Sequence, residues 1–125
     1  MYVIVLFKHE GIFMSLGSLE LEILNSVWKL QTIDEDMNIS VKDVVDDMMK
    51  NDMERAYTTV KTVMDRLSSK ELLVRYRAGK KFFYKTVMDK DEMAISSIKE
   101  ISNQFFNGNI SEMLHFIEEQ CVDLV

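Results

Sequence analysis

The side chains best suited to binding chemistry lie close together between residues 55 and 85. This segment holds nine basic side chains and two acidic ones, Asp65 and Glu71, so it carries +7 in a chain whose net charge is −6. A positive field confined to one segment is typical of a surface that faces phosphates, whatever the charge of the whole chain. A lysine-rich hairpin is also a common soluble edge that resists aggregation, so charge alone leaves both interpretations open.

A helix must present the first part of this segment. Apolar side chains recur at helical spacing from about Tyr57 to Lys70 and predict one buried stripe. The stripe consists of Val60, Val63, Met64 and Leu67. The opposite, outward face then carries Thr58, Lys61, Thr62 and Asp65. That face is the one a DNA major groove would meet.

A β-hairpin is expected directly after this helix. Residues 73–77 and 81–85 are rich in β-branched, aromatic and leucine side chains, and Ala78-Gly79-Lys80 separates them with a glycine at the tip. A helix that leads into a short basic hairpin is the layout of a winged helix-turn-helix. The sequence therefore predicts a mainly α fold with a small β-hairpin wing.

Two helices are expected before these elements. The first runs from about Ser18 to Leu30 with a broad apolar stripe, and the acidic segment 32–38 follows as a loop. Ile39 is expected to form a very short strand, and Ser40 with Asp43 resembles a capping arrangement that starts the second helix. The buried face predicted for the second helix consists of Val41, Val44, Val45, Met48 and Met49.

Residues 89–125 predict two further helices with a break at Gly108. Asp89 with Glu92 and Asn109 with Glu112 are typical helix starts, and both helices carry apolar stripes with coiled-coil-like spacing. The stripes consist of Ala94, Ile98, Ile101 and Phe105, and of Ile110, Met113, Leu114, Ile117, Cys121 and Leu124. Helices this short need a packing partner. The partner is either the rest of the chain or the same helices of a second copy, and the spacing favours the homodimer.

Composition excludes several other classes of function. Cys121 is the single cysteine and the two histidines have no ligand-spaced partner, so we expect neither a disulfide nor a metal site. No pattern pairs a nucleophile with a base and no glycine-rich phosphate loop is present, so we expect no enzyme and no cofactor. The apolar run from Tyr2 to Phe7 is too short to span a bilayer, which predicts a cytoplasmic protein without a membrane partner. Residues 1–13 are either an added strand or an over-extended start.

Four stretches of the sequence resemble the penicillinase-repressor family of transcriptional regulators, whose members include regulators of β-lactam resistance and of copper transport. They are LGSLELEILNSVW from Leu16 to Trp28, AYTTVKTVMDRLSSKELLVR from Ala56 to Arg75, the hairpin end Phe83-Tyr84, and FFNGN from Phe105 to Asn109. The resemblance implies an N-terminal extension over residues 1–14, a winged-helix DNA-binding domain over 15–88 and a helical dimerisation segment over 89–125.

The same resemblance implies which side chains meet a double-stranded DNA operator. The positions of the family's recognition helix are Tyr57, Thr58, Thr59, Lys61 and Thr62. The further expected DNA contacts are Arg55, Arg66, Arg75, Arg77, Lys80 and Lys81. Short hydroxyls suit base edges, Lys61 and Arg55 can reach phosphates or guanine, and the four wing cations suit backbone phosphates. Two alternatives stay open, because a threonine could instead cap the helix, and Arg66 and Asp65 could instead form local ion pairs on the helix, which is the role expected of Asp65.

The sequence departs from the family pattern in three places. Asp43, Asp46 and Asp47 are expected on the exposed side of the second helix, which argues against phosphate contacts there. With Cys121 alone, copper sensing through thiolates is not expected. His115-Phe116 aligns with the cleavage position of the β-lactam-responsive branch, but its spacing from Gly108 differs by one residue and the flanking residue differs, so control by a regulatory protease or sensor stays open.

Two functions from different classes are carried forward. The first is a homodimeric repressor that binds a dyad-symmetric operator, since one two-fold axis would relate two recognition helices and two wings. The alternative is a winged helix used for protein interaction, whose basic surface docks an acidic partner. A preference for palindromic DNA would fit only the first function.

Overall fold

The computed structural model describes residues 16–124, apart from the side chain of the last of these. This part of the chain divides into two units, residues 16–90 and residues 91–124. The N-terminal extension expected over residues 1–14, with its two alternative interpretations, lies outside the described residues. Among the residues that are described, no helix combines the length and the apolarity needed to cross a bilayer.

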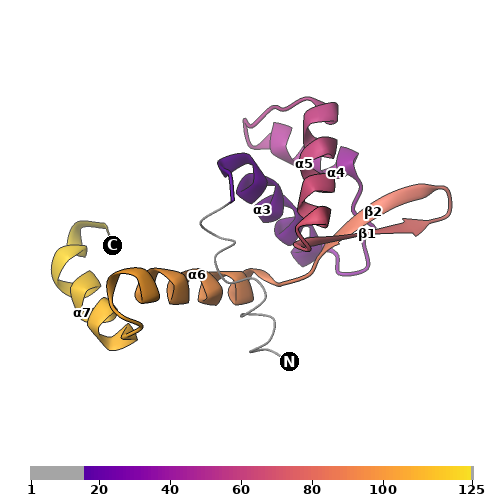
Figure 1. The fold of residues 1–125 in the computed structure, drawn as a ribbon. Helices are drawn as coiled ribbons and strands as arrows, with labels where there is room; N and C mark the ends of the chain where they lie inside the picture. The colour runs from indigo at the N-terminus through magenta and orange to yellow at the C-terminus, as the bar shows by residue number, and fades with distance from the viewer. Residues whose placement is uncertain (1–15, 125) are drawn as a thin grey trace. The chain divides into compact units, whose positions relative to one another are not determined.

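Three helices and a two-stranded hairpin build the unit 16–90 (Figure 1). The helices are α3 Ser18–Ile33, α4 Val41–Lys50 and α5 Tyr57–Ser69, and the antiparallel strands are β1 Leu73–Ala78 and β2 Lys81–Thr86. The first helix continues to Ile33, past the end predicted at Leu30. This mainly helical architecture with a small hairpin confirms the predicted fold class.

The core of this unit lies where the three helices and the hairpin meet. Its fully buried side chains include Ile23, Leu24 and Val27 of α3, Val44 and Met48 of α4, Val60, Met64 and Leu67 of α5, and Leu73 and Tyr84 of the hairpin. Trp28 Nε1 donates a hydrogen bond of 3.0 Å to the Met88 carbonyl, which fixes the chain that leaves β2 against α3. Every element of the unit therefore contributes to one apolar core.

Short-range contacts fix where two of the helices begin. Gly17 precedes α3, and its N–H donates to Glu20 Oε1 at 3.0 Å. At the start of α4, Ser40 Oγ accepts the Asp43 N–H at 3.1 Å, and the Asp43 carboxylate accepts the Ser40 N–H at 2.9 Å. This reciprocal pair confirms the predicted capping arrangement.

The buried face of α4 is narrower than the sequence predicts. Val41, Val44 and Met48 are buried, whereas Val45 is half-buried and Met49 is 51% exposed. The three buried residues form one row along the helix, which packs against α3 and α5. The other two flank that row, because a ten-residue helix at the edge of a small core needs to bury only one row of side chains.

The hairpin has a two-residue loop, one residue shorter than predicted. Ala78 pairs with Lys81, so only Gly79 and Lys80 form the connection. Gly79 has φ +65°, a left-handed conformation that glycine adopts without strain and that suits such tight turns. The Tyr84 N–H donates to the Ile39 carbonyl at 2.8 Å, so Ile39, where the sequence allows a very short strand, forms a single antiparallel β-bridge with β2.

The unit 91–124 consists almost entirely of two helices, α6 Lys90–Phe105 and α7 Ile110–Gln120, followed by a single 3-10 turn, η1 Val122–Leu124. Asn107 and Gly108 both have positive φ, and the Gly108 N–H closes the end of α6 by donating to the Ser102 carbonyl at 3.0 Å. Asn109 Oδ1 then accepts the Glu112 N–H at 3.0 Å and starts α7. Both the break and the second helix start match the sequence prediction.

Candidate nucleic-acid interface

The outward face of α5 carries hydroxyl and cationic side chains. Its opposite face is the predicted apolar stripe from Val60 to Leu67, which is buried in the core. The exposed positions on α5 include Tyr57, Thr58, Thr59, Lys61 and Thr62. Ala56 precedes the helix and no side chain caps it, so the interpretation of a threonine as the helix cap is wrong. These threonines are therefore available on the surface.

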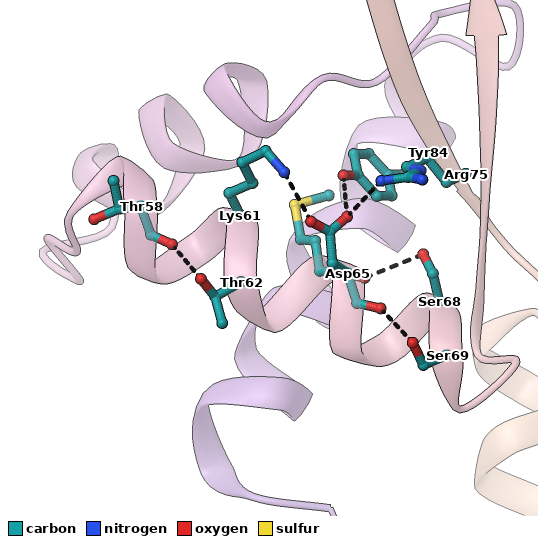
Figure 2. Close-up of polar contacts among 9 residues, drawn as sticks. Thr58, Lys61, Thr62, Asp65, Ser68, Ser69, Arg75 and Tyr84 are labelled. Carbon is teal, nitrogen blue, oxygen red and sulfur yellow. Dashed lines mark hydrogen bonds and ion pairs between the residues drawn. The ribbon is translucent and has the colours of Figure 1, made fainter.

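The Thr62 hydroxyl has a defined direction in the unbound protein. Its Oγ1 donates to the Thr58 carbonyl at 2.9 Å, one turn earlier on α5 (Figure 2). With the proton engaged inside the helix, the oxygen lone pairs and the methyl group are what the side chain offers outward. An exocyclic amino group of adenine or cytosine, or a thymine methyl, is the complementary partner in a major groove.

Asp65 lies at the point where α5 meets the hairpin and accepts from three side chains (Figure 2). Lys61 Nζ lies 2.8 Å from Oδ2, the Tyr84 hydroxyl donates to Oδ1 at 2.7 Å, and Arg75 Nη1 lies 3.4 Å from the same oxygen. The local ion pair expected of Asp65 on the helix is confirmed, and its partner is Lys61 one turn earlier. One carboxylate thus joins α5, β1 and β2.

The protonation of this cluster follows from its contacts. Burial alone raises the pKa of the Asp65 carboxyl, but the Lys61 and Tyr84 hydrogen bonds and the nearby charges of Lys61 and Arg75 hold that pKa below its ordinary value. Burial, together with the Asp65 hydrogen bond, raises the pKa of Tyr84 to about 12. Near neutral pH, Asp65 is therefore an anion, and Tyr84 stays protonated and donates a hydrogen bond to it.

One face of the hairpin continues the surface of α5. The register places Arg75 opposite Tyr84 and Arg77 opposite Phe82, so these four side chains share a face. The guanidinium carbons of Arg75 and Arg77 lie 4.6 and 5.7 Å from the centre of the Phe82 ring. Cation–π contacts of this kind hold the two guanidinium groups beside the Phe82 ring on this face of the wing.

The remaining predicted cations differ in what they contact. Lys80 and Lys81 are exposed at the hairpin tip, and Arg66 is exposed on α5. Arg55 donates to the Glu54 carbonyl at 2.9 Å and lies 3.7 Å from Glu22, so a weak ion pair holds it beside α3. The side chains that are predicted to contact phosphates therefore lie on α5, on the segment just before α5 and on the wing.

An ion pair that the sequence did not predict removes one cation, Lys70, from this surface. Lys70 Nζ lies 2.8 and 3.1 Å from the two carboxylate oxygens of Glu20, a residue that is 6% exposed. Burial by itself raises the pKa of Glu20, but the hydrogen bonds from Lys70 and the Gly17 N–H, with the charges of Lys70 and Arg66, lower it overall. The pair joins the start of α3 to the end of α5, and its partners lie far apart in the sequence.

The acidic side of α4 is less exposed than expected. Asp47 accepts from Ser26 Oγ at 2.7 Å and lies 2.7 Å from Lys29 Nζ, so α3 neutralises it. Asp43 is engaged in the helix cap. Of the three aspartates that were expected to repel phosphates, only Asp46 is exposed, and the other two are half-buried. The structure thus weakens the sequence-based argument against phosphate contacts near α4.

The predicted dimerisation positions are mostly exposed in this single chain. Phe105 is 74% exposed and Leu114 is 54% exposed. The other exposed positions are Ala94, Ile98, Ile101, Ile110 and Ile117. Met113 is buried, Cys121 is a half-buried free thiol, and the Leu124 side chain lies outside the described residues. Two rows of apolar side chains on α6 and α7 therefore remain uncovered.

Two further features bear on the functions considered from the sequence, one in α7 and one across the described residues. His115 and Phe116, the pair that aligns with a family cleavage position, lie within α7, where Phe116 packs on Phe106 with ring centres 5.4 Å apart. Within residues 16–123, no three histidine, cysteine, aspartate or glutamate side chains gather as metal ligands would.

The fold and this surface define a winged-helix protein, and two sequence comparisons identify its family. A family described as "Penicillinase repressor" matches residues 16–124. A "Penicillinase repressor" of Staphylococcus aureus is 22% identical over 95 residues, which cover 76% of this chain and 70% of that protein. The chain belongs to the penicillinase repressor family. It is accordingly a DNA-binding transcriptional repressor and not an enzyme.

Proposed function

We propose that this repressor binds as a homodimer to a dyad-symmetric operator, with α5 in the major groove and the hairpin wing on the flanking phosphates. The observation that carries the proposal is the contrast in exposure between the units. Residues 16–90 close their own apolar core, whereas α6 and α7 leave apolar rows uncovered. Large apolar side chains on two consecutive helices favour a protein partner, and a second copy supplies an identical surface.

The DNA-facing side of the proposal rests on the charge and direction of side chains. The face of α5 offers hydroxyls at Thr58, Thr59 and Thr62, which suit base edges. Lys80 and Lys81 at the wing tip suit backbone phosphates, since such contacts position a protein without reading sequence. An operator-binding repressor acts where the chromosome lies, so the expected cytoplasmic location belongs to this proposal.

A selection of bound duplexes from a random pool tests the proposal, with the full chain at a concentration where its oligomeric state is measured by sedimentation. We expect a dimer and a selected inverted repeat whose half-site centres lie about 10 base pairs, or a multiple of that, apart. A selected sequence without two-fold symmetry, or a monomer that binds at full strength, would contradict it. Salt-sensitive binding without any sequence preference would favour the alternative, a basic surface that docks an acidic protein.

A further inference from the structure

Asp65 is an acidic side chain on a surface built from cations and hydroxyls. It lies on α5 between Lys61 and the wing, and its carboxylate oxygens are 2.8 Å from Lys61 Nζ and 3.4 Å from Arg75 Nη1. A phosphate-binding surface gains nothing in affinity from an anion at this place, because the anion cancels one of two neighbouring positive charges. Its presence therefore calls for a different role.

We infer that Asp65 is a positioning residue for operator specificity, which holds Lys61 of the recognition helix and Arg75 of the wing in one fixed arrangement. The inference rests on the proposed binding of DNA by this surface. The Tyr84 hydroxyl, which donates to Asp65 at 2.7 Å, anchors the carboxylate to the core, since Tyr84 is 2% exposed. Lys61 and Arg75 are thus both positioned by a carboxylate that is itself fixed to the core.

The physical effect differs between specific and random DNA. Random duplexes bind through charge alone, so the Asp65 carboxylate weakens that mode by repelling phosphates and occupying two cations. At the operator, Lys61 and Arg75 already lie where they are needed, and less side-chain freedom is lost on binding. A group that weakens binding to random DNA and preorganises the protein for the operator raises the ratio of operator affinity to random-DNA affinity.

A purely structural role accounts poorly for this arrangement. The side chains of Lys61, Asp65 and Arg75 retain 50%, 33% and 43% of their exposure, and ion pairs this accessible to water add little to folding stability. Tyr84 is the buried member, and its hydroxyl needs an acceptor that a neutral asparagine oxygen could also provide. Replacing Asp65 with asparagine therefore removes the charge while keeping an acceptor of the same shape.

The test compares the full-length wild type with Asp65→Asn, Tyr84→Phe and Asp46→Asn. Asp46→Asn is the matched control, because it removes one negative charge from an exposed position on α4. Anisotropy titrations over a salt series give the affinities for the wild-type-selected duplex and for a scrambled duplex of equal length. Thermal unfolding midpoints show whether each variant is folded.

For Asp65→Asn we expect affinity for scrambled DNA to rise several-fold at low salt and its salt slope to steepen by up to about one, since the surface gains one unit of net positive charge. The ratio of selected to scrambled affinity should fall by about fivefold or more. Tyr84→Phe keeps the charge but removes the anchor, so the ratio should fall while the salt slope stays unchanged. Asp46→Asn should leave the ratio within about twofold of the wild type.

Two results would overturn the inference. Equal gains on both duplexes, matching those of Asp46→Asn, would make Asp65 an ordinary surface charge. Equal losses on both duplexes together with a lower unfolding midpoint would make it a structural residue. If Asp65→Asn does not fold, the ratio measured for Tyr84→Phe decides. Failure of the wild type to prefer any duplex is a separate result, which would reject the proposed function and this inference with it.

Discussion

Residues 16–90 and 91–124 use their apolar side chains in opposite ways. In the first unit the side chains of the predicted stripe on α5 are buried, and the charged side chains around it are paired across elements, as Glu20 is with Lys70. In the second unit the predicted stripe positions include Phe105, at 74% exposed, and Leu114, at 54%. Equal apolar periodicity thus marks a core in one unit and an uncovered surface in the other. Apolar periodicity shows which face of a helix must be covered, but it does not show whether the same chain or another molecule covers it.

The largest effect is expected when the second unit is removed, in a chain that ends at Lys90. Such a chain keeps the whole core of the first unit, so it should fold cooperatively and sediment as a monomer. Its affinity for the selected operator should fall by about a hundredfold or more, because linking two half-site contacts through a dimer commonly multiplies affinity by 10² to 10⁴. Sedimentation, thermal unfolding and operator titration measure the three expectations. A shortened chain that binds like the full chain would place no function in residues 91–124.

A point variant makes the same comparison in the full chain. Leu114→Glu puts a charge on the exposed row of α7, and in a two-fold interface the charge appears twice. We expect dimer dissociation to rise by at least tenfold, since each buried leucine contributes about 1.5 to 3 kcal/mol. Ile33→Glu is the matched control, because Ile33 is 73% exposed at the end of α3. Equal effects of the two variants would contradict a dimer interface on α7.

Within the first unit, Thr62→Ala should have the next largest effect, and only on the operator. The Thr62 side chain is exposed and its hydroxyl bonds only the Thr58 carbonyl among the described contacts, so folding should change little. Loss of a good base contact should cost about 1 to 3 kcal/mol on the selected duplex and little on a scrambled one. Titration of both duplexes separates the outcomes. Equal losses on both would make Thr62 a phosphate contact.

The elements and caps of this protein follow from its sequence, but its ion-pair network does not. The stripe on α5, the Ser40-Asp43 cap and the Gly79 turn each depend on residues within a few positions of one another, so periodicity and turn chemistry predict them. Glu20 and Lys70 are 50 positions apart, and Asp65 and Tyr84 are 19 apart. Such pairs depend on how helices and hairpin pack, which one sequence does not encode in any local pattern.

The same network gives a smaller and pH-dependent prediction. Glu20→Gln removes the charge that faces Lys70, and we expect it to lower the free energy of unfolding by about 1 to 2 kcal/mol at neutral pH, because one charge of a largely buried pair is left unmatched. Folding lowers the pKa of Glu20, so its stabilisation is present above the ordinary glutamate value and is lost as pH falls through the lowered value.

Denaturant unfolding of wild type and Glu20→Gln at several pH values measures this dependence. The difference between the two proteins should be constant near neutral pH and shrink below about pH 4, where glutamate protonates. Glu22→Gln serves as the control, since its contact with Arg55 is longer, at 3.7 Å, and should be worth less than about 1 kcal/mol. A difference that persists unchanged in acid would show that the Glu20–Lys70 charge pair is not its source.

The smallest expected effect concerns the wing tip and is best seen as a salt slope. Lys80 and Lys81 are exposed beside the Gly79 turn, and their replacement by alanine should weaken binding to selected and scrambled DNA alike. The slope of log affinity against log salt should become shallower by up to about two, since each phosphate contact contributes roughly 0.9. Lys99→Ala removes a charge from α6 instead and should leave the slope nearly unchanged. If the wing variant keeps the wild-type slope, the hairpin tip does not lie on the phosphates, and the contacts of the first unit with DNA must come from α5, from Arg55 and from the arginines of β1.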